Sequence, residues 1–130
     1  MFSFFKIKNF VTNFFKYNKL YIEALSAENN CKAYELSDNV VGKEIVIYGF
    51  GEYGVDFFRN SIHSVKVNAI YDKAYKYMNK YVESPDNIID QRFDYVVITV
   101  MDNKLRKSVV NFLLEKNVPK EKFVFVNYVL

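Results

Sequence analysis

Three of the chain's four glycines lie within six residues, as Gly49, Gly51 and Gly54 of the stretch VIYGFGEYG. A β-branched apolar run comes directly before them and an amphipathic stretch directly after. The spacing G-x-G-x-x-G between a strand and a helix is typical of turns that bind nucleotide phosphates. The first glycine allows the tight bend, the second lets a pyrophosphate approach the backbone, and the third lets the helix pack closely on the strand. The feature predicts a strand, a phosphate-binding turn and a helix over residues 44–63.

Downstream of Lys43 the chain alternates between short apolar runs and amphipathic segments. Strands are expected at residues 44–50, 65–72, 80–82, 93–100 and 122–127. Helices are expected at residues 52–63, 84–90 and 103–117. This alternation calls for a parallel sheet with right-handed crossovers. We therefore predict an α/β fold, a minimal Rossmann-like five-stranded parallel sheet in the order 3-2-1-4-5 with helices on both faces.

The ends of two expected helices carry recognisable signals. Ser84 is expected as the N-cap of the short helix, with Pro85 in its first position. Asn117 is expected to stop the last helix in a left-handed conformation. The spacing of that helix predicts an inward face made of Leu105, Val109, Phe112 and Leu113.

Residues 1–40 are expected to form a helical N-terminal segment, and residues 41–130 a nucleotide-binding domain. A second short helix is expected over residues 21–36. The first 22 residues carry four lysines and no acidic residue, with an apolar face at helical spacing. That face is expected to pack on the domain or to form a homodimer, and a membrane surface is the less favoured partner. Its members are Phe4, Ile7, Phe10, Val11, Phe14, Phe15, Leu20 and Ile22.

Composition excludes several classes of function. The net charge is only +3, and three of the 18 basic residues are arginine, so no nucleic-acid partner is expected. Cys31 is the only cysteine, which excludes an internal disulfide and the usual structural zinc sites and favours a cytoplasmic location. No apolar run reaches the roughly 18 residues of a membrane span, and no secretory signal is recognised.

The second expected strand ends in Asp72, 18 residues after Gly54, where an acid would accept hydrogen bonds from ribose hydroxyls. Lys73 beside it would tolerate a 2′-phosphate, which leaves NAD and NADP both open. Glu52 in the first helical turn argues against tight binding, because its charge would repel a pyrophosphate. The candidate cofactor-binding residues are Gly49, Phe50, Gly51, Glu52, Tyr53, Gly54, Asp72, Lys73 and Thr99.

Two other interpretations of the glycines stay open. The turn could serve packing alone and bind nothing. An S-adenosylmethionine site is less favoured, because Ile47 stands where an acid is usual and Tyr53 where the third glycine of G-x-G-x-G would be.

The stretches VIYGFGEYG, AIYDK, SPDNI, DYVVITV and NVPKEKFVFVN carry a resemblance to a known group. Residues 43–130 resemble the small NAD(P)-binding-like Rossmann domains of bacterial surface-polysaccharide and sugar-modifying proteins. Such domains form the N-terminal part of sugar acetyltransferases, where they bind the nucleotide-sugar, or the C-terminal part of sugar methyltransferases, and others accompany sugar transferases. The resemblance implies a phosphate turn at Gly49, Gly51 and Gly54, a ribose acid at Asp72, and loops after the third and fourth strands at Ser84–Pro85 and Thr99–Asn103.

No catalytic residues are expected. No tyrosine has lysine four positions on, and the chain lacks D-x-D, G-x-S-x-G and H-E-x-x-H. His63 and Cys31 are expected to be structural, and no metal site is expected. The expected function is a nucleotide- or nucleotide-sugar-binding module in bacterial surface-glycan biosynthesis, a sugar transferase by association. The alternatives are a non-catalytic interaction subunit and an NAD(P)-dependent oxidoreductase half that needs a partner.

Overall fold

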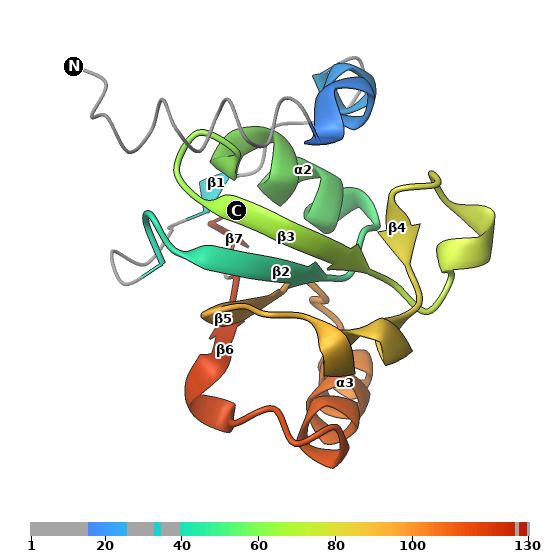
Figure 1. The fold of residues 1–130 in the computed structure, drawn as a ribbon, viewed down its shortest axis with the longest axis vertical. Coiled ribbons are helices and arrows are strands. Elements are labelled where there is room, and N and C mark those ends of the chain that lie inside the picture. The colour runs from blue at the N-terminus through green and yellow to red at the C-terminus, as the bar shows by residue number, and fades with distance from the viewer. Residues whose placement is uncertain (1–15, 26–32, 35–39, 127, 130) are drawn as a thin grey trace.

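The computed structural model describes residues 16–25, 33–34, 40–126 and 128–129 of the 130-residue chain. Five parallel strands form its main sheet, in the order β4-β3-β2-β5-β6 (Figure 1). This is the predicted order 3-2-1-4-5, and it confirms the α/β, Rossmann-like fold. The strands are β2 (Glu44–Tyr48), β3 (Lys66–Tyr71), β4 (Val82–Glu83), β5 (Tyr95–Ile98) and β6 (Phe123–Phe125).

The central strand β2 lies between β3 and β5 and is covered on both faces. Ile45, Val46 and Ile47 are fully buried. A strand of a parallel sheet that is buried on both faces reads as a continuous apolar run, which is why the sequence EIVIY locates it so clearly.

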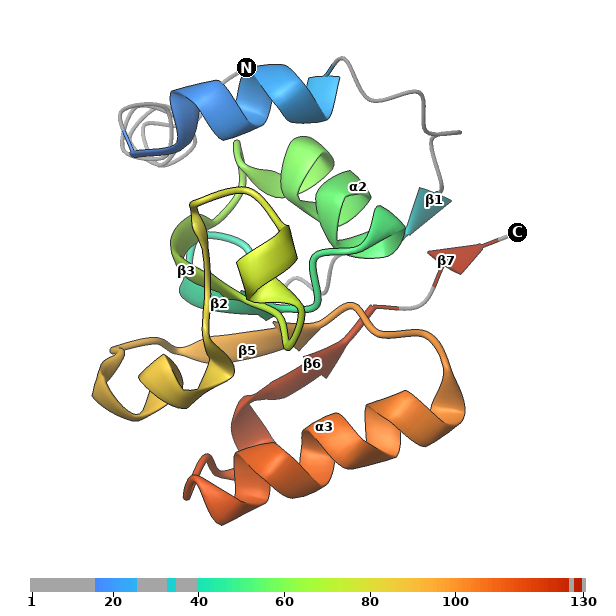
Figure 2. The ribbon, with the colours of Figure 1, turned by 90° about the vertical axis from the view of Figure 1, so that its right-hand side faces the viewer.

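Helices cover the two faces of the sheet as separate layers. The helix α2 (Glu52–Ser61) and a helix at residues 16–25 lie on one face, and α3 (Asn103–Glu115) lies on the other (Figure 2). Three short 3-10 helices complete the layers: η1 (Tyr75–Tyr77), η2 (Pro85–Asp90) and η3 (Lys120–Lys122). A separate hydrophobic core lies between each face of the sheet and the helices that cover it. One core includes Phe57 and Phe58, and the other includes Tyr71 and Leu113.

The predicted helix signals are confirmed. The Ser84 hydroxyl accepts a hydrogen bond from the Asp86 N–H at the start of η2, with Pro85 in the first turn. Asn117 has a φ of 64° just beyond α3. The predicted inward face of α3 is wrong at Leu105, which is 58% exposed, because burial on this face begins only at Val109.

The prediction of a helix over residues 21–36 is wrong at Ala33–Tyr34. These residues form the strand β1, which pairs antiparallel with β7 (Tyr128–Val129). The apolar residues predicted at positions 4–15, and Cys31, lie outside the described residues.

The helix at residues 16–25 packs into the core of the domain. Tyr17, Leu20 and Ala24 are buried, and the ring of Tyr17 meets that of Phe58 edge-on at 5.7 Å. Arg59 of α2 forms an ion pair with Asp56 and donates to the Ala24 carbonyl oxygen at 3.2 Å. Ile22, another predicted member of this apolar face, is 61% exposed and so does not pack on the domain.

Candidate functional site

The first glycine of the turn is fixed by its backbone conformation. Gly49 has a φ of +105°, a region that side-chain-bearing residues rarely adopt. Its N–H donates to the Tyr71 carbonyl oxygen at 2.8 Å, which ties the turn to the end of β3. A Cβ at this position would lie 2.6 Å from the Thr99 hydroxyl oxygen, so both conformation and space require glycine.

Gly54 is fixed by the contact between α2 and the turn. A Cβ there would lie 2.0 Å from the Gly49 carbonyl oxygen and 2.8 Å from its carbonyl carbon. Both atoms belong to the backbone and cannot rotate away. Close helix-to-strand packing, the role predicted for this glycine, therefore accounts for it.

Gly51 differs from Gly49 and Gly54. It is the N-cap of α2 with a φ of −77°, which any residue adopts, and a Cβ there would meet nothing within 4 Å. It caps α2 without a side-chain hydrogen bond. Neither backbone conformation nor packing requires glycine here. The space beside Gly51 lies at the positive end of a helix dipole, where an anion is stabilised.

Asp72 holds the turn in place. One carboxylate oxygen accepts the Phe50 N–H at 2.8 Å, and the other accepts the Ala74 N–H at 2.8 Å. A carboxylate has about four lone-pair positions, so two accepted hydrogen bonds leave room for ribose hydroxyls. The predicted ribose acid and the predicted phosphate turn are thus brought together by a direct hydrogen bond.

Two of the predicted binding residues, Thr99 and Phe50, have structural roles. The Thr99 hydroxyl is buried and donates to the Gly49 carbonyl oxygen at 2.6 Å, which joins β5 to the turn. Phe50 is 7% exposed, and its ring packs against Phe58 with centroids 5.9 Å apart.

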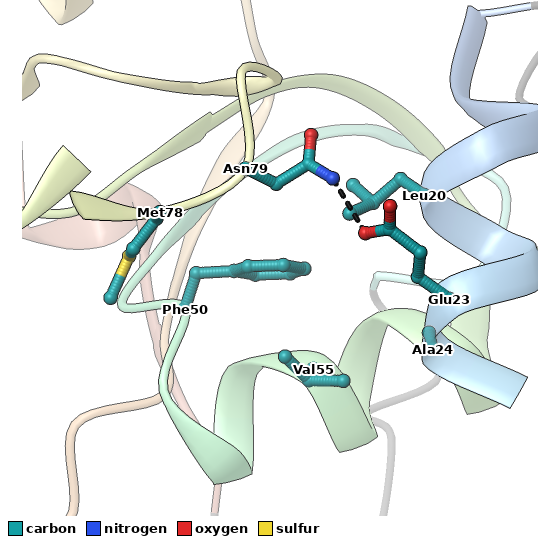
Figure 3. Close-up of a pocket in the computed structure, with 7 residues that line it drawn as sticks. All are labelled: Leu20, Glu23, Ala24, Phe50, Val55, Met78 and Asn79. Atoms are coloured by element: carbon teal, nitrogen blue, oxygen red, sulfur yellow. Dashed lines mark hydrogen bonds between the residues drawn. The ribbon is translucent and has the colours of Figure 1, made fainter. Parts of the chain in front are cut away.

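The Phe50 ring also lines a cavity of about 270 Å³ between α2 and the helix at residues 16–25 (Figure 3). This cavity is mostly apolar, and the Asn79 amide spans it by donating to the Glu23 carboxylate at 2.6 Å. It lies on the α2 side of the turn, and Gly51 and Asp72 do not line it. Its walls are Leu20, Glu23, Ala24, Phe50, Val55, Met78 and Asn79.

The remaining predicted residues lie around the start of α2 and the end of β3. Glu52 is exposed in the first turn of α2, next to the open space at Gly51. Tyr53 is half-buried in the same turn, and Lys73 is exposed just after Asp72. The Glu52 carboxylate lies at the surface at the start of α2, and its negative charge is the feature of the turn that opposes a phosphate.

A second cavity, of about 360 Å³, lies at the carboxyl ends of β2, β3 and β4. The crevice beyond the carboxyl ends of parallel strands is where open α/β sheets bind ligands. Of the predicted cofactor-binding residues only Lys73 lines this cavity, together with Ser84 and Pro85 of the loop that the resemblance implied after the third strand. The walls are Tyr48, Lys73, Tyr75, Lys76, Tyr77, Ser84, Pro85, Asp86 and Phe112.

Tyr48, the last residue of β2, is the feature of this cavity that the sequence did not reveal. The residue is 3% exposed, and its buried hydroxyl has no hydrogen-bond partner among the described residues. Burial, together with the charges of Asp72 and Asp86, raises the pKa of the Tyr48 phenol to about 12. The phenol is therefore neutral at physiological pH.

Other chemistry has less support in the part of the chain described. His63 follows α2, and its ring meets that of Tyr21 edge-on at 6.3 Å, on the α2 side of the sheet. Over residues 16–25, 33–34, 40–126 and 128–129, no three His, Cys, Asp or Glu side chains gather as metal ligands would. Over the same residues, no helix has the length and hydropathy to cross a bilayer.

Comparisons of the chain with protein-family models and with curated proteins found no match.

Proposed function

We propose that this protein is a nucleotide- or nucleotide-sugar-binding module of bacterial surface-glycan biosynthesis, associated with sugar transfer. The phosphates lie beside Gly51 at the start of α2, and the ribose hydroxyls bond to Asp72. The pathway assignment comes from the resemblance of residues 43–130 to sugar-modifying proteins, and the binding mode comes from the turn.

One observation supports this binding mode: Gly51 differs from Gly49 and Gly54 in what its position requires. Gly49 and Gly54 are required by conformation and packing, whereas a Cβ at Gly51 would face open space. A turn that served packing alone would need the first and third glycines, whereas at the N-cap of α2 glycine is only one of several favoured residues. Close approach of a ligand to the backbone supplies a reason for the second.

The experiment is a ligand-induced thermal shift with UDP, UDP-glucose, NAD and NADP. Binding to the native state stabilises it by about 2.7 kcal/mol when the free ligand is at a hundredfold excess over Kd. A shift with UDP or UDP-glucose supports the proposal. A shift with NAD or NADP alone favours the oxidoreductase half, and no shift with any of them favours the interaction subunit.

Gly51→Val is the matched variant. The φ of −77° accepts valine, and the open space accommodates its side chain, so the variant is expected to fold. Its methyl groups would occupy the phosphate position, and the thermal shift with UDP should disappear. Asn111→Val, at an exposed position of α3 on the other face of the sheet, is the control that should retain the shift. An unchanged shift in a folded Gly51→Val protein would place the phosphates elsewhere.

A further inference from the structure

The cavity of about 270 Å³ between α2 and the helix at residues 16–25 has walls from four separate parts of the fold. Three side chains come from the helix at residues 16–25, one from the glycine turn, one from α2 and two from the segment after η1 (Figure 3). Neither Gly51 nor Asp72 lines it, so it is separate from the proposed nucleotide site. An apolar cavity of about 150 Å³ already holds a benzene molecule, so this one has room for a substituted ring or a short alkyl chain.

The helix at residues 16–25 is fixed on α2 near both of its ends, which keeps the cavity open. Near its start, the Tyr17 ring meets that of Phe58 edge-on at 5.7 Å. Near its end, the Ala24 carbonyl oxygen accepts a hydrogen bond from Arg59 at 3.2 Å. The helix therefore cannot move closer to Phe50 without breaking one of these two contacts. Protein interiors contain few voids larger than a water molecule, so a cavity that the packing holds open in this way is a candidate binding site.

The polarity of the walls indicates the kind of molecule that fits. The two polar side chains bond within the protein: the Asn79 amide nitrogen donates to the Glu23 carboxylate at 2.6 Å, and the Asn79 amide oxygen accepts the Tyr81 N–H at 3.1 Å. A buried water is held where it has about two to four polar partners, so these walls hold water poorly. An apolar occupant suits them better. The other wall residues are all apolar: Leu20, Ala24, Phe50, Val55 and Met78.

We propose that this cavity binds a small uncharged apolar molecule, of the size of a substituted ring or a short alkyl chain, which packs against Phe50, Val55 and Met78. The unbranched side chain of Met78 adapts to the shape of an apolar ligand and makes favourable contacts with rings. The exposed carboxylate of Glu23 also lines the cavity, so a negatively charged ligand is disfavoured. The site is independent of the proposed nucleotide site, and either can fail without the other.

The test is methyl NMR of the full chain titrated with toluene, 1-hexanol and hexanoate. Toluene and 1-hexanol should shift the methyl signals of Leu20, Val55 and Met78 in a saturable way. The methyl signals of Val109 and Leu113, in the core on the other face of the sheet, should not move. No saturable shift with either molecule, or equal shifts in both cores, would overturn the proposed site.

The charge of the ligand is tested by comparing 1-hexanol with hexanoate. Hexanoate should bind about fivefold more weakly in low salt, because its carboxylate would lie near that of Glu23. Glu23→Gln keeps an oxygen that can accept from Asn79 and removes the charge, so it should bring the two Kd values to within about twofold of each other. Hexanoate that binds the wild type as tightly as 1-hexanol would overturn the preference for an uncharged molecule.

Val55→Phe, which fills the cavity, and Val110→Phe form a matched pair of variants. Both valines are half-buried on a helix, and Val110 lies on α3 on the other face of the sheet. Val55→Phe should weaken toluene binding at least about tenfold, and Val110→Phe should leave its Kd within about twofold of the wild type. A folded Val55→Phe protein that binds toluene as tightly as the wild type would overturn the site. If Val55→Phe does not fold, the methyl shifts of the wild type decide the question alone.

Discussion

Paired alanine substitutions at Gly54 and Gly51 separate a glycine that the fold needs from one that it does not. At Gly54 the new Cβ would lie 2.0 Å from the Gly49 carbonyl oxygen, far inside van der Waals contact. Relieving this overlap costs about 1–3 kcal/mol or more, as overpacking in cores does. The displaced residue also bonds through its N–H to Tyr71 and through its oxygen to Thr99, and each weakened bond costs about 1 kcal/mol.

Against these costs, alanine is favoured over glycine inside a helix by about 1 kcal/mol. The expected net loss for Gly54→Ala is therefore about 2–4 kcal/mol, a large share of the roughly 5–15 kcal/mol that stabilises a typical domain. At Gly51 the backbone accepts alanine, and reduced freedom of the unfolded chain gains about 0.4–1 kcal/mol. Alanine is a poorer N-cap than glycine by a similar amount, so Gly51→Ala should stay within about 0.5 kcal/mol of the wild type.

Urea unfolding followed by circular dichroism measures both variants, and an unchanged m-value would show that the midpoints report stability. A loss of 2 kcal/mol or more for Gly51→Ala would mean that packing requires this glycine too, which removes the main support for a phosphate there. A neutral Gly54→Ala would show that the turn is looser than the close approach of its two backbones indicates.

The remaining predictions concern Tyr48, Glu52 and the exposed apolar pair Ile22 and Leu25. Tyr48→Phe should raise the free energy of unfolding at pH 7 by about 1 kcal/mol, because it removes a buried hydroxyl that has no partner among the described residues. The Tyr48 pKa of about 12 lies above the unfolded value near 10, because burial disfavours the phenolate in the folded protein. This group therefore leaves stability independent of pH below pH 10, and stability falls as the pH rises from 10 through 12. Urea titrations between pH 9 and 12 should show a shallower loss of stability in Tyr48→Phe than in the wild type. Glu52→Gln should tighten UDP binding about fivefold in low salt, because an exposed charge some 4 Å from a phosphate costs about 1 kcal/mol in water. Isothermal titration should show a smaller effect at 0.5 M salt, where the charge is screened. The double substitution Ile22→Asp and Leu25→Asp should convert a dimer to a monomer in sedimentation velocity. It should not lower the melting temperature, because both side chains are more than half exposed. A wild-type protein that sediments as a monomer would contradict dimerisation through this face.

The strand order and the places of the glycines could be predicted because physical constraints leave a trace in the sequence. A central parallel strand such as β2 must be apolar along its length, and a turn that passes under a helix must have glycine where backbones touch. Ala33–Tyr34 and Tyr128–Val129 form strands of only two residues each, too short to produce a periodic pattern. Helical spacing identified the face that carries Val109, but spacing does not show how far along its length a helix lies over a sheet.

Part of the candidate site could be predicted because it, too, depends on constraints that are visible in the sequence. The turn and Asp72 follow from residue types at fixed spacings. Thr99 was predicted as a binding residue, but its hydroxyl already donates a hydrogen bond to the Gly49 carbonyl oxygen. Tyr48 could not be found, because a tyrosine at the end of a strand has no distinctive pattern. Its hydroxyl lacks a partner in the described part of the chain because of the side chains that η2, α3 and the residues after β3 place around it, and this is a property of the packed molecule.

The chemistry of the site supports recognition without bond-making, and we predict that the chain alone turns over no UDP-sugar and no NAD(P)H. A general base near neutral pH needs a pKa close to 7, whereas the Tyr48 phenol, with its pKa raised to about 12, is a hydrogen-bond donor. The Thr99 hydroxyl already donates to the Gly49 carbonyl oxygen, and the Asp72 carboxylate accepts two backbone N–H groups. We expect the acid, base or metal ligands of any reaction to come from a partner enzyme. Chromatographic assay of UDP-glucose and absorbance assay of NADH with the purified full chain would check this, and turnover that copurifies with the protein and is abolished by Tyr48→Phe would contradict it.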